Sequence, residues 1–418
     1  MSIDVAPART SRFTLPLYLA ASATSLFGNS AINIVLPWLV LERTGNPSLA
    51  GTVAAVSAIP SAVAALAGGH LIDRFGRRRM SVLSDIGSAL AVAALAVVDR
   101  LTGLDLTWFI ILGITGALFD LPGMTARETL MANVAHTSGR SLDAIAGFRQ
   151  GIFGLSFLLG PAIAGLLLTV LPAIQVVWIT AACSALAALF IAVMPLLPMP
   201  EAPSDEENPM GALGTVRASR PLSLLILLNV ISMLLVAPLL AVLLPAHFQS
   251  MSQPDRLGAS LSAFAVGTII GGGVYASLLK RRRLVAWVAG NLLFLASFIA
   301  IAPLDGFWLP AVGMLLAGIG QGVQGPIVAV LLTEHVPDHL RGRIFGLMTS
   351  LGALASPAGL GLMAVLLHGR PLHVGGWALA IAWLPAAIWA CVQPDLRRWL
   401  TRPVIDAPAE EPADADHR

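Results

Sequence analysis

The chain has 418 residues, of which 56% are hydrophobic and 11% are charged. Soluble proteins of ordinary composition are about 25% charged, so this composition excludes a typical water-soluble enzyme. The net charge of +2 comes from basic residues in short clusters rather than on one face, which excludes a nucleic-acid-binding surface. Cys183 and Cys391 lie in apolar blocks and indicate neither a disulfide nor a metal pair.

Twelve long apolar segments dominate the chain, and each is long enough to cross a bilayer core about 30 Å thick. Helices are expected rather than barrel strands, because the segments are uniformly apolar and do not alternate. The first segment is longer than a signal-peptide core and is expected to remain as a membrane helix. The predicted spans are 14–41, 47–72, 80–98, 106–126, 145–170, 174–198, 221–245, 257–279, 284–303, 308–333, 343–367 and 375–393.

The positions of Lys and Arg between the spans predict the orientation, because cytoplasmic loops carry the excess of basic residues. With the N-terminus in the cytoplasm, 20 of the 25 basic residues fall in cytoplasmic loops and tails, and Arg149 falls inside a span. The four on the outer side are Arg43, Arg100, Arg256 and Arg370. The sequence therefore predicts a multi-pass protein of the cytoplasmic membrane with both termini in the cytoplasm.

The chain divides into two similar halves. A polar, Pro-rich segment at 199–220 is a predicted cytoplasmic linker between six-helix bundles at 1–198 and 221–396, and 397–418 is a predicted disordered tail. An Arg-Arg-Arg run at 77–79 recurs at 281–283, 204 residues later. This predicts an all-α integral membrane protein whose bundles are related by a pseudo-two-fold axis along the membrane normal, with a substrate path between them.

The loop between the second and third spans carries the most specific motif, GHLIDRFGRRRM at 69–80. Its glycines permit close helix packing and a tight turn, and Asp73 can pair with arginines or with a helix N-terminus. The motif resembles the signature loop of the major facilitator superfamily. The resemblance implies the major facilitator fold, and a latch between the halves formed by Gly69, Asp73, Arg74, Gly76, Arg77 and Arg78. The alternative is that the arginines only set topology, as the run Lys280 to Arg283 is expected to do.

The fifth span resembles the antiporter signature of drug-exporting members of that superfamily. Its matching positions are Gly147, Ser156, Gly160, Pro161 and Gly165, with Ser156 in place of one glycine. Small residues there allow a close approach across the interface between the halves, and Gly160-Pro161 introduces a bend. Simple helix packing is the alternative function of these residues.

Three charged residues lie within predicted spans, where a charge costs about 2.5–3.5 kcal/mol on insertion scales. Asp120 lies about 18 Å from the outer end of its helix and is the first candidate for a proton-carrying carboxylate. Arg149 is the expected partner of Asp120 in proton coupling, and the alternative is a fixed ion pair. Asp85 is expected to belong to the Asp73 latch more than to the proton site.

Uncharged polar residues in the spans are candidates for lining a substrate cavity, although each is equally suited to an interhelical hydrogen bond. Asn29 and Asn33 are four residues apart and share one helix face. The complete set of candidates is Asn29, Asn33, Gln150, Asn229, Gln321 and Gln324.

Four further segments resemble the Tap-like multidrug exporters, a branch related to macrolide-efflux proteins. They are LPWLVLERTG, GMTARETL, GRSLDAIAG and HLRGRIFGLMTSLGALASPAGL. The resemblance implies proton-driven efflux of amphipathic molecules such as tetracyclines and aminoglycosides. Asn29 and Gln150 stand where relatives often carry acids, which leaves Asp120 or Asp85 for the proton, or a different form of coupling.

The expected partners are a small-molecule substrate, protons and membrane lipid, with no nucleic acid, and the expected state is a monomer. The absence of a G-x-x-x-x-G-K-[ST] loop argues against an ATP-driven pump, and the eight histidines show no H-E-x-x-H spacing. A transporter without metal or cofactor is therefore expected rather than an enzyme. The alternative is export of an endogenous compound: a charge-rich cavity favours a siderophore, and an apolar cavity favours drugs or a lysolipid.

Overall fold

The computed structural model describes residues 11–197, 214, 216, 219–336 and 338–401, in which every regular element is helical. The side chains of residues 62, 65–70, 73, 143, 338–339 and 341–343 also lie outside the description. The elements of the first half are α1 (Thr14–Thr44), α2 (Pro47–Phe75), α3 (Arg77–Leu101), α4 (Leu106–Thr129), α5 (Met131–Ser138), α6 (Leu142–Val170) and α7 (Ala173–Val193). Those of the second half are α9 (Arg220–Pro238), η1 (Leu239–Leu243), α10 (Leu244–Ser250), α11 (Pro254–Val274), η2 (Tyr275–Leu279), α12 (Arg283–Ile301), α13 (Trp308–His335), α14 (Asp338–Leu366), α15 (Leu372–Val392) and α16 (Pro394–Thr401).

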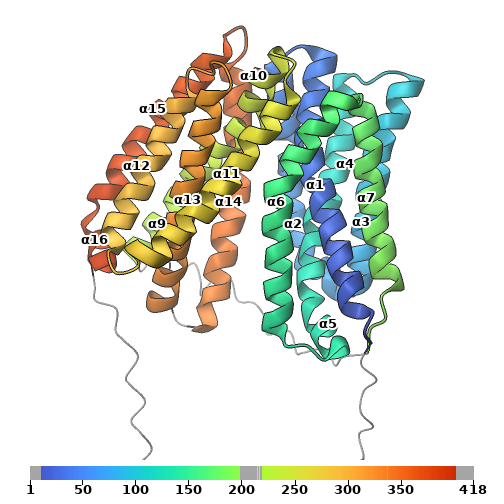
Figure 1. Cartoon of the computed structure of the whole chain (residues 1–418), viewed down its shortest axis with the longest axis horizontal. Coiled ribbons are helices and arrows are strands. Elements are labelled where there is room, and N and C mark those ends of the chain that lie inside the picture. Colours follow the sequence, from blue (N-terminus) through green and yellow to red (C-terminus); the bar gives the residue numbers. More distant parts are fainter. Residues whose placement is uncertain (1–10, 198–213, 215, 217–218, 337, 402–418) are drawn as a thin grey trace, which may run out of the picture.

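The helices form two bundles that lean together, one made of α1 to α7 and the other of α9 to α16 (Figure 1). Within the described chain, eleven helical segments are long and apolar enough to cross a membrane. The remaining predicted span corresponds to α2, a helix of 29 residues that packs along α4 and α14. The all-α membrane fold expected from the sequence is therefore confirmed.

Local signals explain where the spans begin and end. The side chain of Asn46 accepts a hydrogen bond from the backbone N–H of Ser48 and caps α2, while Asp105 caps α4 in the same way. The turn between α1 and α2 contains Gly45 at φ 62°, a left-handed conformation that glycine adopts at low cost. These caps supply partners for backbone N–H groups at the helix ends, which have none within the helix.

The seventh predicted span is interrupted. After Pro238, α9 passes into the π-helical segment η1 before α10 resumes, because a proline inside a helix removes one backbone hydrogen bond and crowds the preceding turn. Such π-helical segments are frequent at functional sites, and η1 contributes to the larger of the two cavities described below.

Two short helices were not predicted from the apolar segments. The helix α5 follows α4 directly, and α16 extends to Thr401, so the predicted tail from 397 begins with an ordered helix. The helix α16 is held by the burial of Leu396 and Leu400 and by the Trp399 ring, which stacks on His335 with centroids 3.9 Å apart. The predicted linker at 199–220 lies largely outside the described residues, as does the tail beyond 401.

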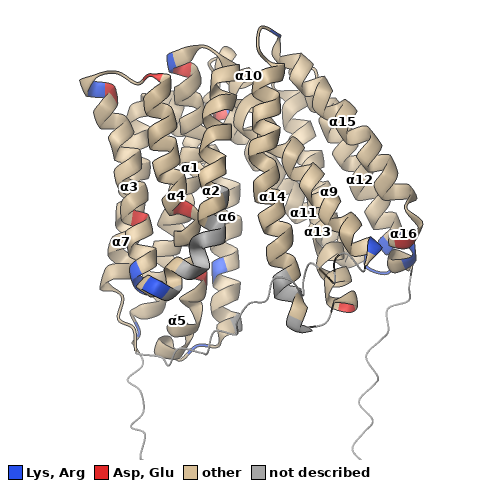
Figure 2. Ribbon diagram, turned by 180° about the vertical axis from the view of Figure 1, so that it is seen from behind, with Lys and Arg blue, Asp and Glu red and all other residues tan. Residues whose placement is uncertain are grey.

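The helices α5 and α16 lie at one end of the molecule, which we call the terminal face, and α10 lies at the other, the distal face (Figure 1). Most of the basic residues coloured in Figure 2 lie toward the terminal face. The chain enters α1 at the terminal face and passes to the distal face at the turn into α2.

The two halves meet from the middle of the molecule to the distal face, where α6 packs along α11 and α2 packs along α14. Two hydrogen bonds between described residues join the halves: Ser48 Oγ donates to the carbonyl of Ala364 over 2.7 Å, and Ser262 Oγ donates to the carbonyl of Leu158 over 2.6 Å. A Cβ atom added to Gly258 would collide with the carbonyl of Pro161 on α6. Backbone therefore lies against backbone at this interface, as small residues permit.

Candidate functional site

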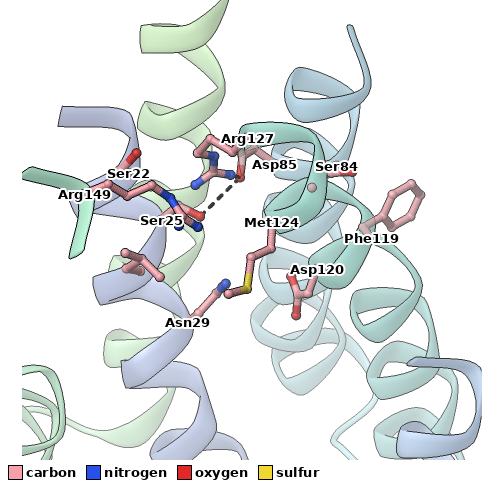
Figure 3. A pocket seen from close by; sticks show the side chains of 12 residues that line it. Ser22, Ser25, Asn29, Ser84, Asp85, Phe119, Asp120, Met124, Arg127 and Arg149 are labelled. Carbon is pink, nitrogen blue, oxygen red and sulfur yellow. Dashed lines mark hydrogen bonds and ion pairs between the residues drawn. The ribbon is translucent and has the colours of Figure 1, made fainter. Parts of the chain in front are cut away.

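A small polar cavity lies inside the first bundle, between α1, α3, α4 and α6 (Figure 3). Its volume is about 20 Å³, close to the space that one water molecule needs. Charged and hydroxyl side chains from these helices converge on it. The lining residues are Ser22, Ser25, Leu26, Asn29, Ser84, Asp85, Phe119, Asp120, Gly123, Met124, Arg127 and Arg149.

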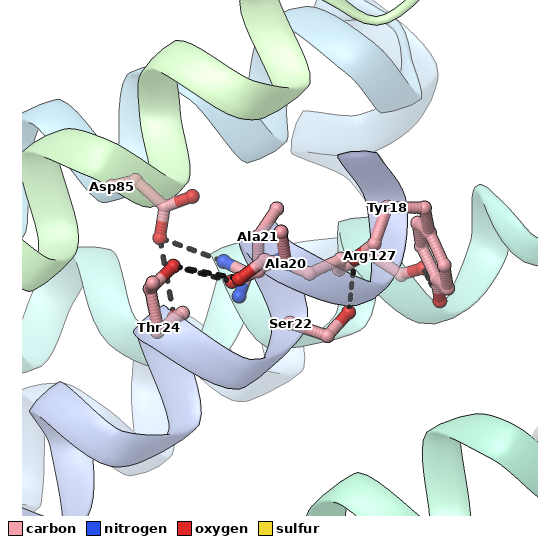
Figure 4. A network of polar contacts seen from close by, with 8 residues as sticks. Tyr18, Ala20, Ala21, Ser22, Thr24, Asp85 and Arg127 are labelled. Carbon is pink, nitrogen blue, oxygen red and sulfur yellow. Dashed lines mark hydrogen bonds and ion pairs between the residues drawn. The ribbon is translucent and has the colours of Figure 1, made fainter. Parts of the chain in front are cut away.

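A buried ion pair forms one wall of the polar cavity. Arg127 Nη2 lies 2.6 Å from Asp85 Oδ1, and the two side chains are only 7% and 6% exposed. Ser25 Oγ on α1 donates a second hydrogen bond to the same carboxylate oxygen over 3.4 Å. The hydroxyl of Tyr18 donates to the backbone carbonyl of Arg127 over 3.0 Å, so α1, α3 and α4 are joined in one network (Figure 4).

Three buried polar atoms beside the cavity have no hydrogen-bond partner among the described residues: Ser84 Oγ, Asp85 Oδ2 and Arg127 Nε. Unpartnered buried groups are costly, and a polar space of this size with several partners is suited to an ordered water. The ion pair therefore has both the space and the unused bonding capacity to bind one.

Asp120 lies on the same cavity but is not in an ion pair with any described residue. The expected partner, Arg149, instead places Nη2 2.8 Å from Glu128 Oε1. Glu128 lies eight residues beyond Asp120 on α4, about 12 Å nearer the terminal face by the helical rise, where the first turns of α6 begin. The expected pairing of Arg149 with Asp120 was wrong, because Arg149 lies near the end of α6 at the terminal face, level with Glu128.

The signature loop is tied to the first bundle. Gly76, at φ 83°, makes the turn between α2 and α3. Arg77 Nη1 donates to Asn133 Oδ1 on α5 over 3.2 Å, and Arg78 donates to the carbonyls of Ile191 and Ala192 at the end of α7.

Arg74 is exposed, and the side chain of Asp73 and the surroundings of Gly69 lie outside the described residues. Asp85, which was expected beside the Asp73 latch, is instead engaged with Arg127 deep in the bundle. The latch itself stays a prediction.

A larger, apolar cavity of about 380 Å³ lies between the two bundles. The second bundle supplies most of its wall, including residues of η1, while α1 and α6 close it from the first bundle. Phe157 and Phe264, one from each bundle, lie in its wall and contact each other edge to face, with ring centroids 5.8 Å apart. The lining residues are Ser30, Asn33, Ile34, Phe157, Pro161, Val236, Ala237, Leu239, Leu240, Ala241, Leu261, Phe264, Phe294, Ser297, Phe298, Met314, Ala317, Ser356 and Leu360.

The polar residues expected to line one cavity separate in the structure. Only Asn33 lines the apolar cavity, and Asn29 lines the polar one. Asn229 Nδ2 donates to the carbonyl of Met348 over 3.0 Å and so joins α9 to α14. Gln324 packs against Gly290, while Gln150 and Gln321 are exposed and line neither cavity.

The antiporter-type residues of α6 also lie in different environments, some buried and some exposed. Gly160, Pro161 and Gly165 are buried, and a Cβ on Gly165 would collide with the backbone of α11, whereas one on Gly147 would meet open space. Ser156 is half-buried. The distal part of this motif lies at the interface between the bundles.

The helix α1 connects the two cavities. Ser25 bonds to Asp85, Asn29 lines the polar cavity and Asn33 lines the apolar cavity. These residues are four apart, so they lie along one face of the helix over about 12 Å. A single polar stripe therefore extends from the buried ion pair to the interface between the bundles.

Two partners in these ion pairs were not identified from the sequence. Arg127 was counted among loop residues that set topology, and Glu128 was not considered. One signal was available: Arg127 follows Asp120 by seven residues, two helical turns, and so shares its face if the helix continues. In the second bundle, Arg283 likewise makes a two-pronged ion pair with Glu334, each contact being 2.7 Å, where only a topological function was expected.

Comparisons with known proteins agree with this architecture. Residues 18–360 match the Major Facilitator Superfamily. The multidrug efflux pump Tap of Mycolicibacterium fortuitum is 33% identical over 402 residues, which cover 93% of this chain and 97% of that one. Macrolide efflux protein A of Streptococcus pyogenes is 23% identical over 373 residues, covering 86% and 90%.

Among solved structures, that of the nucleoside transporter NupG superposes with a TM-score of 0.71 at 12% identity, covering 93% of this chain and 98% of that one. This likeness shows the fold alone. The family match covers most of the chain, and the resemblance to Tap extends over nearly all of it. The chain therefore belongs to the Major Facilitator Superfamily and is a membrane transporter rather than an enzyme.

Proposed function

We propose that this protein exports amphipathic small molecules across the cytoplasmic membrane by alternating access, in exchange for protons. The observation that carries the proposal is the separation of two cavities, one apolar and between the bundles, the other polar and inside the first bundle. A carrier coupled to an ion needs a place for each of its two cargoes. The names of its relatives, multidrug efflux pump and macrolide efflux protein, support efflux as the direction of transport.

Asp120 is the carboxylate best suited to carry the proton. Arg127 Nη2 lies 2.6 Å from Asp85 Oδ1, so protonation of Asp85 would break a buried salt bridge. Asp120 lines the same cavity without an ion-pair partner in the described chain, so protonation there breaks no salt bridge. A carboxylate at membrane depth that faces a polar cavity is a functional candidate on general grounds.

The polar stripe on α1 supplies the physical link between proton and substrate. Protonation of Asp120 changes the charge of a cavity that Asn29 also lines, and Asn33 lies one turn further, at the substrate cavity. A small shift or rotation of α1 would therefore move lining side chains in both cavities. Tight packing transmits such movements because side chains cannot absorb them locally.

The orientation of the bundles fits a cytoplasm-facing state in this scheme. The excess of basic residues toward the terminal face supports a cytoplasmic location for that face. The contacts between the bundles lie from the middle of the molecule to the distal face. In the alternate state the signature loop, with Asp73 and Arg74, would close the terminal face. The contact between α6 and α11 would serve as the pivot.

Export of an endogenous compound is the second candidate function. The lining of the apolar cavity limits which endogenous compounds could bind there. A siderophore requires polar or charged partners, and no ionisable side chain lines this cavity in the described part of the chain. The apolar wall is compatible with the tail of a lysolipid, but no basic residue among those described faces its phosphate there. Drug-like amphipathic molecules fit the lining better.

Proteoliposomes with an acidified lumen test the proposal. Addition of chloramphenicol, tetracycline or a macrolide to the outside should release protons from the lumen of vesicles in which the cytoplasmic face points outward. Empty liposomes and a protonophore provide the controls. The absence of substrate-dependent proton movement with every compound, despite verified orientation, would contradict proton-coupled efflux.

A further inference from the structure

The apolar cavity contains polar side chains with unused hydrogen-bonding capacity. Ser30, Asn33, Ser297 and Ser356 are the polar residues in its lining, and none of their side chains forms a hydrogen bond with another described residue. Elsewhere in these helices, hydroxyls bond back to the carbonyl four residues earlier, as Ser22 does to Tyr18. The four cavity residues are therefore free to bond to a ligand.

These four residues surround the cavity from both bundles. Ser30 and Asn33 belong to α1 in the first bundle, whereas Ser297 on α12 and Ser356 on α14 belong to the second. A molecule that bonds to both sets bridges the bundles. Every one of these groups is neutral, and hydroxyls and amides both donate and accept hydrogen bonds.

The remainder of the wall is aromatic and aliphatic. Phe157, Phe264, Phe294 and Phe298 present rings to the space, and aliphatic side chains of η1, α13 and α14 fill the gaps between them. No Asp, Glu, Lys, Arg or His lines the cavity in the described residues. An ammonium or phosphate group entering it would lose its hydration without gaining an opposite charge, which is strongly unfavourable.

We propose that this cavity selects uncharged amphipathic molecules, with an aromatic or aliphatic body and neutral hydrogen-bonding groups, and rejects polycations and anions. The inference rests on the proposed function and narrows it, because aminoglycosides, which the sequence resemblance implied as substrates, fall outside the selected class. The volume of about 380 Å³ lies within the range of about 300–1,000 Å³ usual for small-molecule sites.

Equilibrium binding to the full chain in lipid nanodiscs tests the selection separately from transport. The probes are chloramphenicol, an uncharged nitroaromatic with amide and hydroxyl groups, and kanamycin, a polycationic amino sugar. Chloramphenicol should bind saturably, and excess kanamycin should not displace it. Phe264→Ala and Ser356→Ala should each weaken chloramphenicol binding about three- to tenfold, and Phe345→Ala, an exposed position outside the cavity, serves as the matched control.

A change in charge provides the sharper test. Asn33→Asp places a carboxylate in the cavity and should raise affinity for the lipophilic cation tetraphenylphosphonium at least about tenfold relative to wild type, while Asn33→Leu should not. Kanamycin binding or transport comparable to that of chloramphenicol would overturn the inference, as would chloramphenicol binding unaffected by both cavity variants. Selective binding without proton-driven transport would support the inference and contradict the proposed function, so the two fail separately.

Discussion

The buried pair of Asp85 and Arg127 should be the most strongly coupled ion pair in the first bundle. At 2.6 Å and an effective dielectric constant of about 20, the Coulomb attraction is about 6 kcal/mol, of which desolvation offsets a large part. Asp85→Asn leaves an unpaired guanidinium in a site that is 7% exposed, and Arg127→Met leaves an unpaired carboxylate. Each single change should therefore lower the free energy of unfolding by about 3–5 kcal/mol.

The double variant Asp85→Asn with Arg127→Met removes both charges and should be less destabilised than the sum of the single variants by about 2–3 kcal/mol. The measurement is unfolding by SDS titration in mixed micelles, followed by tryptophan fluorescence. Additivity of the two single effects would refute the reasoning, because it would show that neither charge depends on the other.

An exposed pair supplies the matched control. Arg43 Nη2 lies 2.8 Å from Asp99 Oδ2 at the distal face, but the Arg43 side chain is 39% exposed. The same double-mutant cycle there should give a coupling below about 1 kcal/mol. A coupling energy as large as that of the buried pair would mean that the distance between the charged atoms, and not their burial, sets the strength of the ion pair.

Three further predictions concern other parts of the molecule. Gly258→Val should abolish transport, because the added side chain meets the backbone of α6, whereas Gly273→Val, which meets open space, should transport normally; equal activities would contradict the packing argument. Glu128→Gln should change the free energy of unfolding by less than about 1 kcal/mol, since this carboxylate is 46% exposed. A large loss of stability instead would make the pair structural. Trp399→Ala removes the ring stacked on His335 and should make α16 accessible to limited proteolysis; unchanged cleavage would show that α16 is held by other contacts.

The membrane spans were predictable because their signal is long and redundant. A run of about 20 apolar residues excludes most other structures, so a few misread positions move only the helix ends. The predicted span at 145–170, for example, corresponds to α6 at Leu142–Val170. The helices α5 and α16 were missed because each has only eight residues, too few for a periodic apolar pattern to stand out.

The partners inside the bundle were less predictable, because pairing depends on depth and rotation of each helix about its own axis. Sequence position placed Asp120 in the interior of a long helix, but Arg149 pairs with Glu128, which lies two turns further along α4. Arg127 looked like one more loop arginine, since it lies one residue beyond the end of the predicted span at 106–126. Which of several polar residues faces a cavity is likewise set by packing between helices that are distant in sequence.

The central claim, that Asp120 couples proton movement to substrate export, is tested most directly by separating active transport from exchange. Proteoliposomes containing wild type, Asp120→Asn or the exposed control Asp305→Asn are compared for uptake driven by a pH gradient and for exchange of labelled against unlabelled substrate without a gradient. The account predicts that Asp120→Asn loses gradient-driven uptake and proton release but retains exchange, while Asp305→Asn behaves as wild type. Gradient-driven uptake that persists in Asp120→Asn at the wild-type rate would contradict it.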